Sequence, residues 1–124
     1  MSNRSTKIVG AGVPPNAANQ IAGDVQLAVT ALGTTQATAA NVYGDNVQIT
    51  TAAAGTGVIL AGPGYGPGDD VFITNRGANA VLVYPPLGGQ INALAVNAGF
   101  SVAINTQTFL LSFGSNLFYA MAAS

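Results

Sequence analysis

Alternation of apolar and polar residues with a period of two begins near residue 24. Residues 25–31 alternate in this way, and so do residues 47–50. This period, together with many β-branched side chains, is typical of strands that bury one face. The pattern predicts a half-buried strand in each of the two segments. The Ala- and Thr-rich stretch 34–41 between them fits either a helical turn or a loop.

Short apolar segments bounded by Gly, Pro or Asn follow one another through the second half of the chain. They occupy the ranges 58–61, 71–74, 80–84, 90–94, 100–104, 107–113 and 117–121. About nine short strands with turn signals every 8–12 residues are typical of a sandwich or barrel, and alternating βα units are not indicated. We therefore predict a single all-β domain over residues 24–124, a β-sandwich or barrel of the jelly-roll type.

Two linkers predict hairpins between these strands. Residues 75–79, Asn-Arg-Gly-Ala-Asn, contain the residue types that tolerate the positive φ of tight hairpin turns. Residues 114–116, Gly-Ser-Asn, join the last two strands in the same way. Alternate positions should place Phe109, Leu111 and Phe113 on one face of the first of these strands. Leu117, Tyr119 and Met121 should likewise share a face of the second.

Residues 1–23 differ from the rest, because their periodicity is weak and they contain Pro, Asn and Ala. The segment holds two of the three basic residues, Arg4 and Lys7. One interpretation is a disordered terminus. The other is an extended N-terminal arm that lies on a neighbouring subunit. In that case the candidate contact residues are Ile8, Val9, Val13, Pro14 and Pro15.

The shortage of charge indicates association with other chains. Charged residues make up 6% of the chain and the net charge is −1, against about 25% charged residues in a typical soluble domain. Exposed strand edges are usually protected by charges and Pro, and few charges are present here. Segment 80–84 is apolar on both faces, so Val81 and Val83 are candidate interface residues. We expect a homo-oligomer, with a trimer as the favoured form.

The missing residue types argue against an enzyme. The chain has no His, Cys, Trp or Glu, so the usual acid–base groups and the usual zinc or copper ligands are absent. We therefore expect no catalytic site and no cofactor. Three basic residues are too few for a phosphate-binding groove, so no nucleic-acid partner is expected. No run of 18 apolar residues and no secretory signal is evident, so no membrane partner is expected.

Three polar or glycine-rich features carry weak signals. The loop at residues 62–68 lacks the Gly-Lys-Ser/Thr ending of a phosphate loop, and it predicts a stiff turn with Tyr65 at its tip as a candidate contact residue. Asp69 and Asp70 are adjacent, so a strand would direct them to opposite faces, which disfavours a shared calcium site. Arg76 is either the exposed tip of a hairpin or the intersubunit partner of an Asp.

One part of the chain resembles a known group of proteins. The matching motifs are Gly68-Asp69, Ile73–Ala80, Val83–Pro85, Gly88–Asn92 and Gly114–Tyr119. About half of the chain resembles virion structural proteins of tailed bacteriophages, and most of all head decoration (capsid cement) proteins. The resemblance implies a β-rich homo-oligomer that binds the major capsid protein on the outer surface of the head and stabilises the assembled lattice.

Two alternatives stay open beside this interpretation. One is a tail or fibre component with a receptor-binding role, for which exposed aromatic side chains such as Tyr65 would be needed. The other is a cellular β-sandwich binding module. A sugar-binding module would favour Trp for stacking, and the chain has none.

Overall fold

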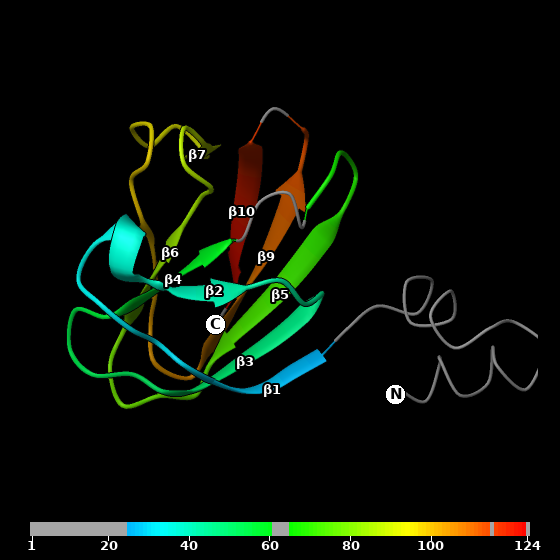
Figure 1. The fold of residues 1–124 in the computed structure, drawn as a ribbon. Helices are drawn as coiled ribbons and strands as arrows, with labels where there is room; N and C mark the ends of the chain where they lie inside the picture. Colours follow the sequence, from blue (N-terminus) through cyan, green and yellow to red (C-terminus); the bar gives the residue numbers. More distant parts are fainter. Residues whose placement is uncertain (1–24, 61–64, 115, 124) are drawn as a thin grey trace, which may run out of the picture.

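The protein folds as a small all-β domain with two sheets (Figure 1). The computed structural model describes residues 25–60, 65–114 and 116–123. The arm expected at residues 1–23 lies outside these residues. The elements are β1 (Val25–Thr30), the 3₁₀ turn η1 (Gln36–Thr38), β2 (Ala40–Val42), β3 (Asn46–Thr51), β4 (Gly57–Leu60), β5 (Asp70–Asn75), β6 (Val81–Tyr84), β7 (Gln90–Ile91), β8 (Phe100–Val102), β9 (Thr106–Ser112) and β10 (Leu117–Ala123).

The first six strands form three stacked coils, because the chain passes from one sheet to the other and back. The larger sheet has the order β1-β3-β5-β9-β10-β7 and the smaller has the order β2-β4-β6-β8. Strands β1, β3 and β5 are parallel, and Val25, Asn46 and Phe72 lie side by side in them. Strands β2, β4 and β6 are also parallel. This arrangement is a short β-solenoid.

Antiparallel strands complete one end of the stack. Strand β8 pairs antiparallel with β6, and β9 pairs antiparallel with β5. The β9–β10 pair is an antiparallel hairpin, as the residues at 114–116 predict. Gly114 and Asn116 have φ values of 83° and 60° there, which suit these residue types. At the other end, β1 and β2 form the first coil and are edge strands of their sheets.

The jelly-roll type of sandwich predicted from the sequence is wrong, although the all-β, single-domain prediction is confirmed. The error arises at connections such as residues 75–79, which join β5 to β6. These two strands lie in different sheets, and none of residues 75–79 has a positive φ. The connection is therefore a corner between sheets and not a hairpin. Turn residues at regular intervals mark both kinds of connection, so their spacing alone does not separate them.

A buried asparagine holds this corner together. The Asn75 side chain is fully buried, and its Nδ2 donates to the carbonyl oxygens of Asn79 at 2.9 Å and Val102 at 3.1 Å. Its Oδ1 accepts a hydrogen bond from the Gly77 N–H at 2.9 Å. Asn79 in turn donates to the Ala52 carbonyl of the preceding coil at 2.9 Å. The corner thus satisfies its own backbone groups and connects two coils.

The core lies between the two sheets and consists mainly of β-branched side chains. In β3, Val47 and Ile49 are buried as the period-two pattern predicts. The pattern of β1 is only partly confirmed, because Val25 and Leu27 are exposed. The register of β1 against β3 shifts twice after Gln26, and such irregularities re-aim the following side chains. The undecided stretch 34–41 contains both η1 and the start of β2.

The Asn75 network generates a prediction for stability. Replacement Asn75→Ala would leave two carbonyl oxygens and one N–H without their partners inside the corner. We expect the free energy of unfolding to fall by about 1–3 kcal/mol. Urea denaturation followed by circular dichroism measures this change. The matched control is Asn41→Ala at an exposed position of β2, which should stay within about 0.5 kcal/mol of wild type. Equal losses in the two variants would contradict the role given to Asn75.

Candidate functional site

The outer face of the six-stranded sheet carries unusually large apolar side chains. In β9 the buried positions are Thr108, Leu110 and Ser112, whereas Phe109 and Leu111 point away from the core and are partly exposed. Two hydroxyl side chains therefore face inward while a phenylalanine and a leucine face outward. A face that served only to contact water would carry the opposite distribution. This reversal makes the face a candidate contact surface.

The same face continues across β10 and β5. Tyr119 and Met121 are 51% and 66% exposed. Met121 and Phe72 flank Phe109 in register, and Tyr119 lies beside Leu111. We call this surface the outer apolar face. It consists of Phe72, Phe109, Leu111, Phe113, Tyr119 and Met121.

Aromatic contacts order this face. The rings of Phe72 and Phe109 have their centroids 4.9 Å apart at 54°. Phe113 and Tyr119 form an edge-to-face pair at 5.2 Å and 88°. Such pairs contribute about 0.5–1.5 kcal/mol beyond area burial. The side chains are therefore held in place before any partner binds, which lowers the entropy lost on binding.

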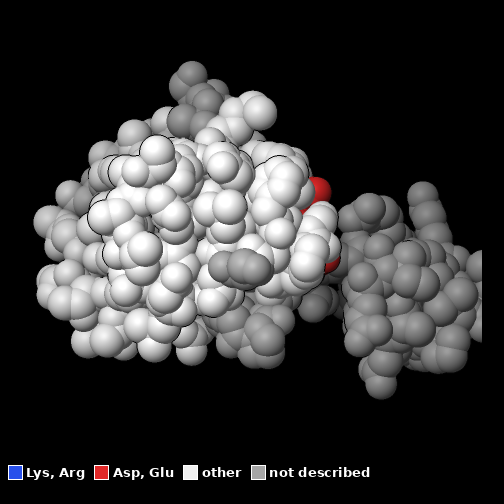
Figure 2. Space-filling model, turned by 90° about the horizontal axis from the view of Figure 1, so that it is seen from above, with Lys and Arg blue, Asp and Glu red and all other residues white. Residues whose placement is uncertain are grey.

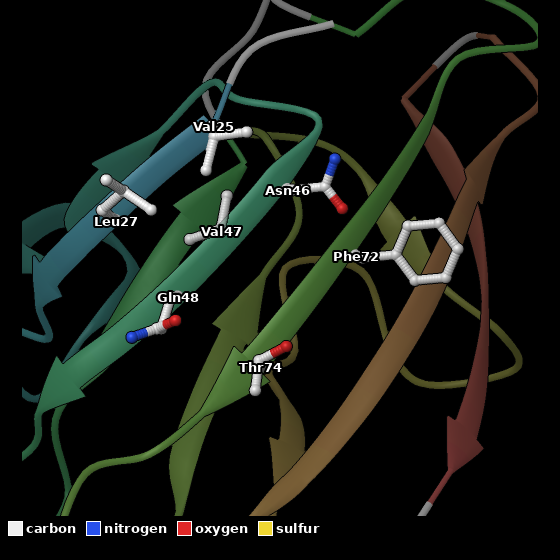
Figure 3. A pocket seen from close by; sticks show the side chains of 7 residues that line it. All are labelled: Val25, Leu27, Asn46, Val47, Gln48, Phe72 and Thr74. Atoms are coloured by element: carbon white, nitrogen blue, oxygen red, sulfur yellow. The ribbon is translucent and has the colours of Figure 1, made fainter. Parts of the chain in front are cut away.

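A shallow groove adjoins the outer apolar face on the side of β1. Its volume is about 110 Å³, which is below the 300–1,000 Å³ or so of small-molecule sites. Figure 3 shows its side chains rising from three neighbouring parallel strands. We call it the β1–β5 groove. Its lining residues are Val25, Leu27, Asn46, Val47, Gln48, Phe72 and Thr74.

The end of the sheet where β3 and β5 begin is acidic. Asp45 immediately precedes β3, and Asp69 and Asp70 lie at the start of β5. The Phe72 N–H donates to the Asp45 carbonyl oxygen at 2.9 Å, so the two strand starts are adjacent. In Figure 2 the described part of the visible face shows acidic atoms only at one edge and no atoms of Lys or Arg.

Tyr65 is anchored at this acidic end and is not a free loop tip. Its hydroxyl donates to the Gly44 carbonyl oxygen at 2.6 Å, and its ring meets Phe118 edge to face at 6.2 Å. Burial raises the pKa of the Tyr65 hydroxyl above its ordinary value, and the nearby charges of Asp45 and Asp69 raise it further. Tyr65 therefore connects its loop to the core.

The other interface candidates lie apart from the outer apolar face. Val81 and Val83 are 1% and 0% exposed and belong to the core, so their assignment to a surface is corrected. Val81 and Val83 are apolar because they form the inner side of β6, which is fully buried. Arg76 is exposed just beyond the end of β5, opposite the acidic end, and its N–H donates to the Ile49 carbonyl oxygen at 2.8 Å. The arm candidates lie outside the described residues: Ile8, Val9, Val13, Pro14 and Pro15.

Alternation in the sequence predicts that the β9 and β10 residues of the outer apolar face share one side of their strands, but it does not show that this side is exposed. Phe109, Leu111 and Phe113 were expected on one face because they alternate, and an apolar face ordinarily indicates the core. The intervening residues Leu110 and Phe118 are equally apolar. Strand β10, Leu117–Ala123, is apolar at nearly every position, and this is the signal that could have revealed an exposed apolar face.

Neither a metal centre nor a spanning helix is found in the described part of the chain. There, no three Asp, Glu, His or Cys side chains are grouped so as to hold a metal ion. Among the same residues, no helix has the length and apolar character that a bilayer crossing requires.

Comparisons with protein-family models, with curated proteins and with solved structures found no match to this chain. The resemblance to phage virion proteins therefore rests on the sequence motifs alone.

The environment of Tyr65 predicts a pH dependence of stability. The folded state keeps the Tyr65 proton above the ordinary pKa of 10, whereas the unfolded chain releases it near that pH. The stabilisation is therefore complete below about pH 10 and is lost as the pH rises further. We expect the free energy of unfolding to fall by up to about 1.4 kcal/mol per pH unit there. Urea denaturation at pH values from about 8 to 11.5 measures this decline.

The variant Tyr65→Phe removes the titrating group and should show a shallower decline than wild type. The exposed Tyr119 provides the matched control, and Tyr119→Phe should keep the wild-type decline. If Tyr65→Phe and wild type decline in parallel, the pH dependence has another source.

Proposed function

We propose that this protein is a non-enzymatic structural protein, a phage head decoration protein that binds the assembled major capsid lattice as a homo-oligomer. The observation that carries the proposal is the outer apolar face, with its pre-ordered aromatic side chains. Contiguous exposed apolar surface marks protein interaction sites more often than free surface. The motifs at residues 68–119 supply the connection to virion proteins.

The chemistry of the face supports a protein partner. Its six residues are uncharged, so binding would depend on apolar contact and shape. Interfaces of this kind are rich in aromatic residues and Met at their centre. Phe109 lies between Phe72 and Met121 in register, which gives the face such a centre.

Binding to a lattice stabilises it by mass action. A protein that binds the assembled shell but not its separated subunits lowers the free energy of the shell at every site. At a free concentration one hundred times Kd the gain is about 2.7 kcal/mol per site. Repeated over many sites, this gain opposes the separation of neighbouring capsid subunits. No catalytic group is needed for such a role, and the chain has no His, Cys or Glu.

A tail or fibre component is the second candidate, and one observation favours it. The first coil ends in two edge strands, β1 and β2. Stacked parallel coils extend in one direction and add units at an open end, which suits an elongated assembly. The two register irregularities in β1 oppose simple strand addition there, so this candidate ranks below decoration of the head.

Immunogold labelling of virions produced from the genome that encodes this chain separates the two candidates. Label distributed over the heads supports the decoration role. Label confined to the tail overturns it in favour of the fibre component. Particles that assemble without any label overturn both. The major capsid protein should also be recovered with this chain after affinity purification from dissociated heads.

The outer apolar face generates a prediction for binding. Met121→Ser and Tyr119→Ser each remove a large side chain from this face. Because burying such a side chain contributes about 1.5–3 kcal/mol, we expect each variant to bind decoration-free heads about 10–100-fold more weakly. Sedimentation of protein with heads over a concentration series measures Kd.

The matched control for this experiment is Leu87→Ser. Leu87 is 73% exposed, lies in the connection from β6 to β7 and is not one of the six residues of the outer apolar face. Its binding should equal that of wild type. If all three variants bind alike, the outer apolar face is not the surface that meets the capsid.

A further inference from the structure

The β1–β5 groove has the chemistry of a site for an extended peptide. Val25 and Leu27 on β1 form an apolar side. Phe72 and Thr74 line the β5 side, where the Phe72 ring is directed toward Phe109 of β9. Between the two sides, Asn46 and Gln48 of β3 present side-chain amides. Amides can both donate to and accept from a peptide backbone, while the apolar side contacts a side chain. The groove is shallow, with a volume of about 110 Å³, so its size suits one small side chain and not a whole small-molecule ligand.

The groove has acidic residues at one end only, so a charged peptide would bind it in one orientation. Asp70 is exposed and precedes Phe72 by two residues, so both side chains emerge on the outer face of β5. Asp45 and Asp69 lie at the same end, and their charges act on Tyr65. Arg76, the basic residue in the part of the chain that the structure describes, follows the opposite end of β5. The groove therefore suits a peptide with a cation placed two residues from a small apolar side chain.

We propose that the β1–β5 groove binds residues 1–24 of a neighbouring copy of this chain, with Val9 in the groove and Lys7 beside Asp70. Lys7 and Val9 are two residues apart, so an extended backbone directs both side chains to the same face. Their separation of about 6.6 Å along a strand equals that of Asp70 and Phe72. The N-terminal segment thus matches the groove in charge, in spacing and in side-chain size.

Length and sequence favour a neighbouring copy over the same chain. Twenty-four residues precede Val25 and span up to about 80 Å when extended, which is ample to reach another subunit. Pro14 and Pro15 lie between Val9 and β1. Consecutive prolines favour an extended backbone, which favours reach toward another copy over folding back onto the chain's own groove. The inference rests on the homo-oligomer of the proposed function and identifies one of its contacts.

Cross-linking tests the source of the segment, because the chain has no Cys of its own. The double variant Ile8→Cys/Thr50→Cys places one thiol next to Val9 in the sequence and one at the exposed Thr50 of β3, two residues beyond the groove residue Gln48. A short bismaleimide should join these thiols between chains and yield bands at multiples of 12.3 kDa. The control Ile8→Cys/Ser101→Cys carries its second thiol at the exposed Ser101 of β8, in the other sheet, and should yield no such bands.

The outcomes are distinct. A link within one chain means that the segment binds its own groove, and the absence of any link means that the segment does not lie in the groove. Either result overturns the inference. Labelling of virion heads that persists in those cases leaves the proposed function standing. Interchain bands without any label on virions leave the inference standing and remove the function.

Charge exchange supplies a second test by light scattering of the full chain. Val9→Ser should raise the concentration at which the oligomer dissociates by about tenfold. Lys7→Glu should also raise it, and the double variant Lys7→Glu/Asp70→Lys should restore the wild-type value. An oligomer that is unaffected by Val9→Ser and Lys7→Glu, or a double variant that is weaker than both single variants, overturns the contact.

Discussion

The parallel stacking of strands in two facing sheets is the constraint on which the rest of this structure depends. Each coil places one strand in each sheet, so successive strands of a sheet pair in parallel and only their inner sides share a core. Corners between the sheets must then satisfy buried backbone groups without the tight turn of a hairpin. The Asn75 side chain does this for the β5–β6 corner through three hydrogen bonds. Loss of such a corner would affect two coils at once.

The same constraint creates the exposed surface. A strand presents alternate side chains to opposite sides, and the smaller sheet covers only the inner side of the larger one. In β9 and β10 both sets of alternate positions contain large apolar residues, so one set is necessarily left outside. Phe109 and Met121 are in that set. The aromatic pairs then stabilise the exposed side chains in one arrangement, which a partner can bind at low entropic cost.

The two parts of this surface differ in chemistry and complement each other. The side formed by β9 and β10 is apolar and uncharged, and it suits a broad protein contact. The side formed by β1, β3 and β5 is a narrow groove with amides beside an apolar wall and an acidic end. The proposed lattice contact and the proposed subunit contact use different parts of one sheet, so one small domain has room for both.

Strand identity and the all-β class follow from local information, because period-two patterns and β-branched residues act within a single segment. Val47 and Ile49 are buried as their pattern predicts, and the β9–β10 hairpin follows from Gly114 and Asn116. Which sheet each strand joins was decided only in the tertiary structure. Residues 75–79 could make a hairpin or a corner, and the choice depends on whether β6 finds its partners in β4 and β8. The direction of the apolar faces was decided in the same way, since Phe109 and Leu110 are both apolar and only the position of the second sheet determines which of them is buried.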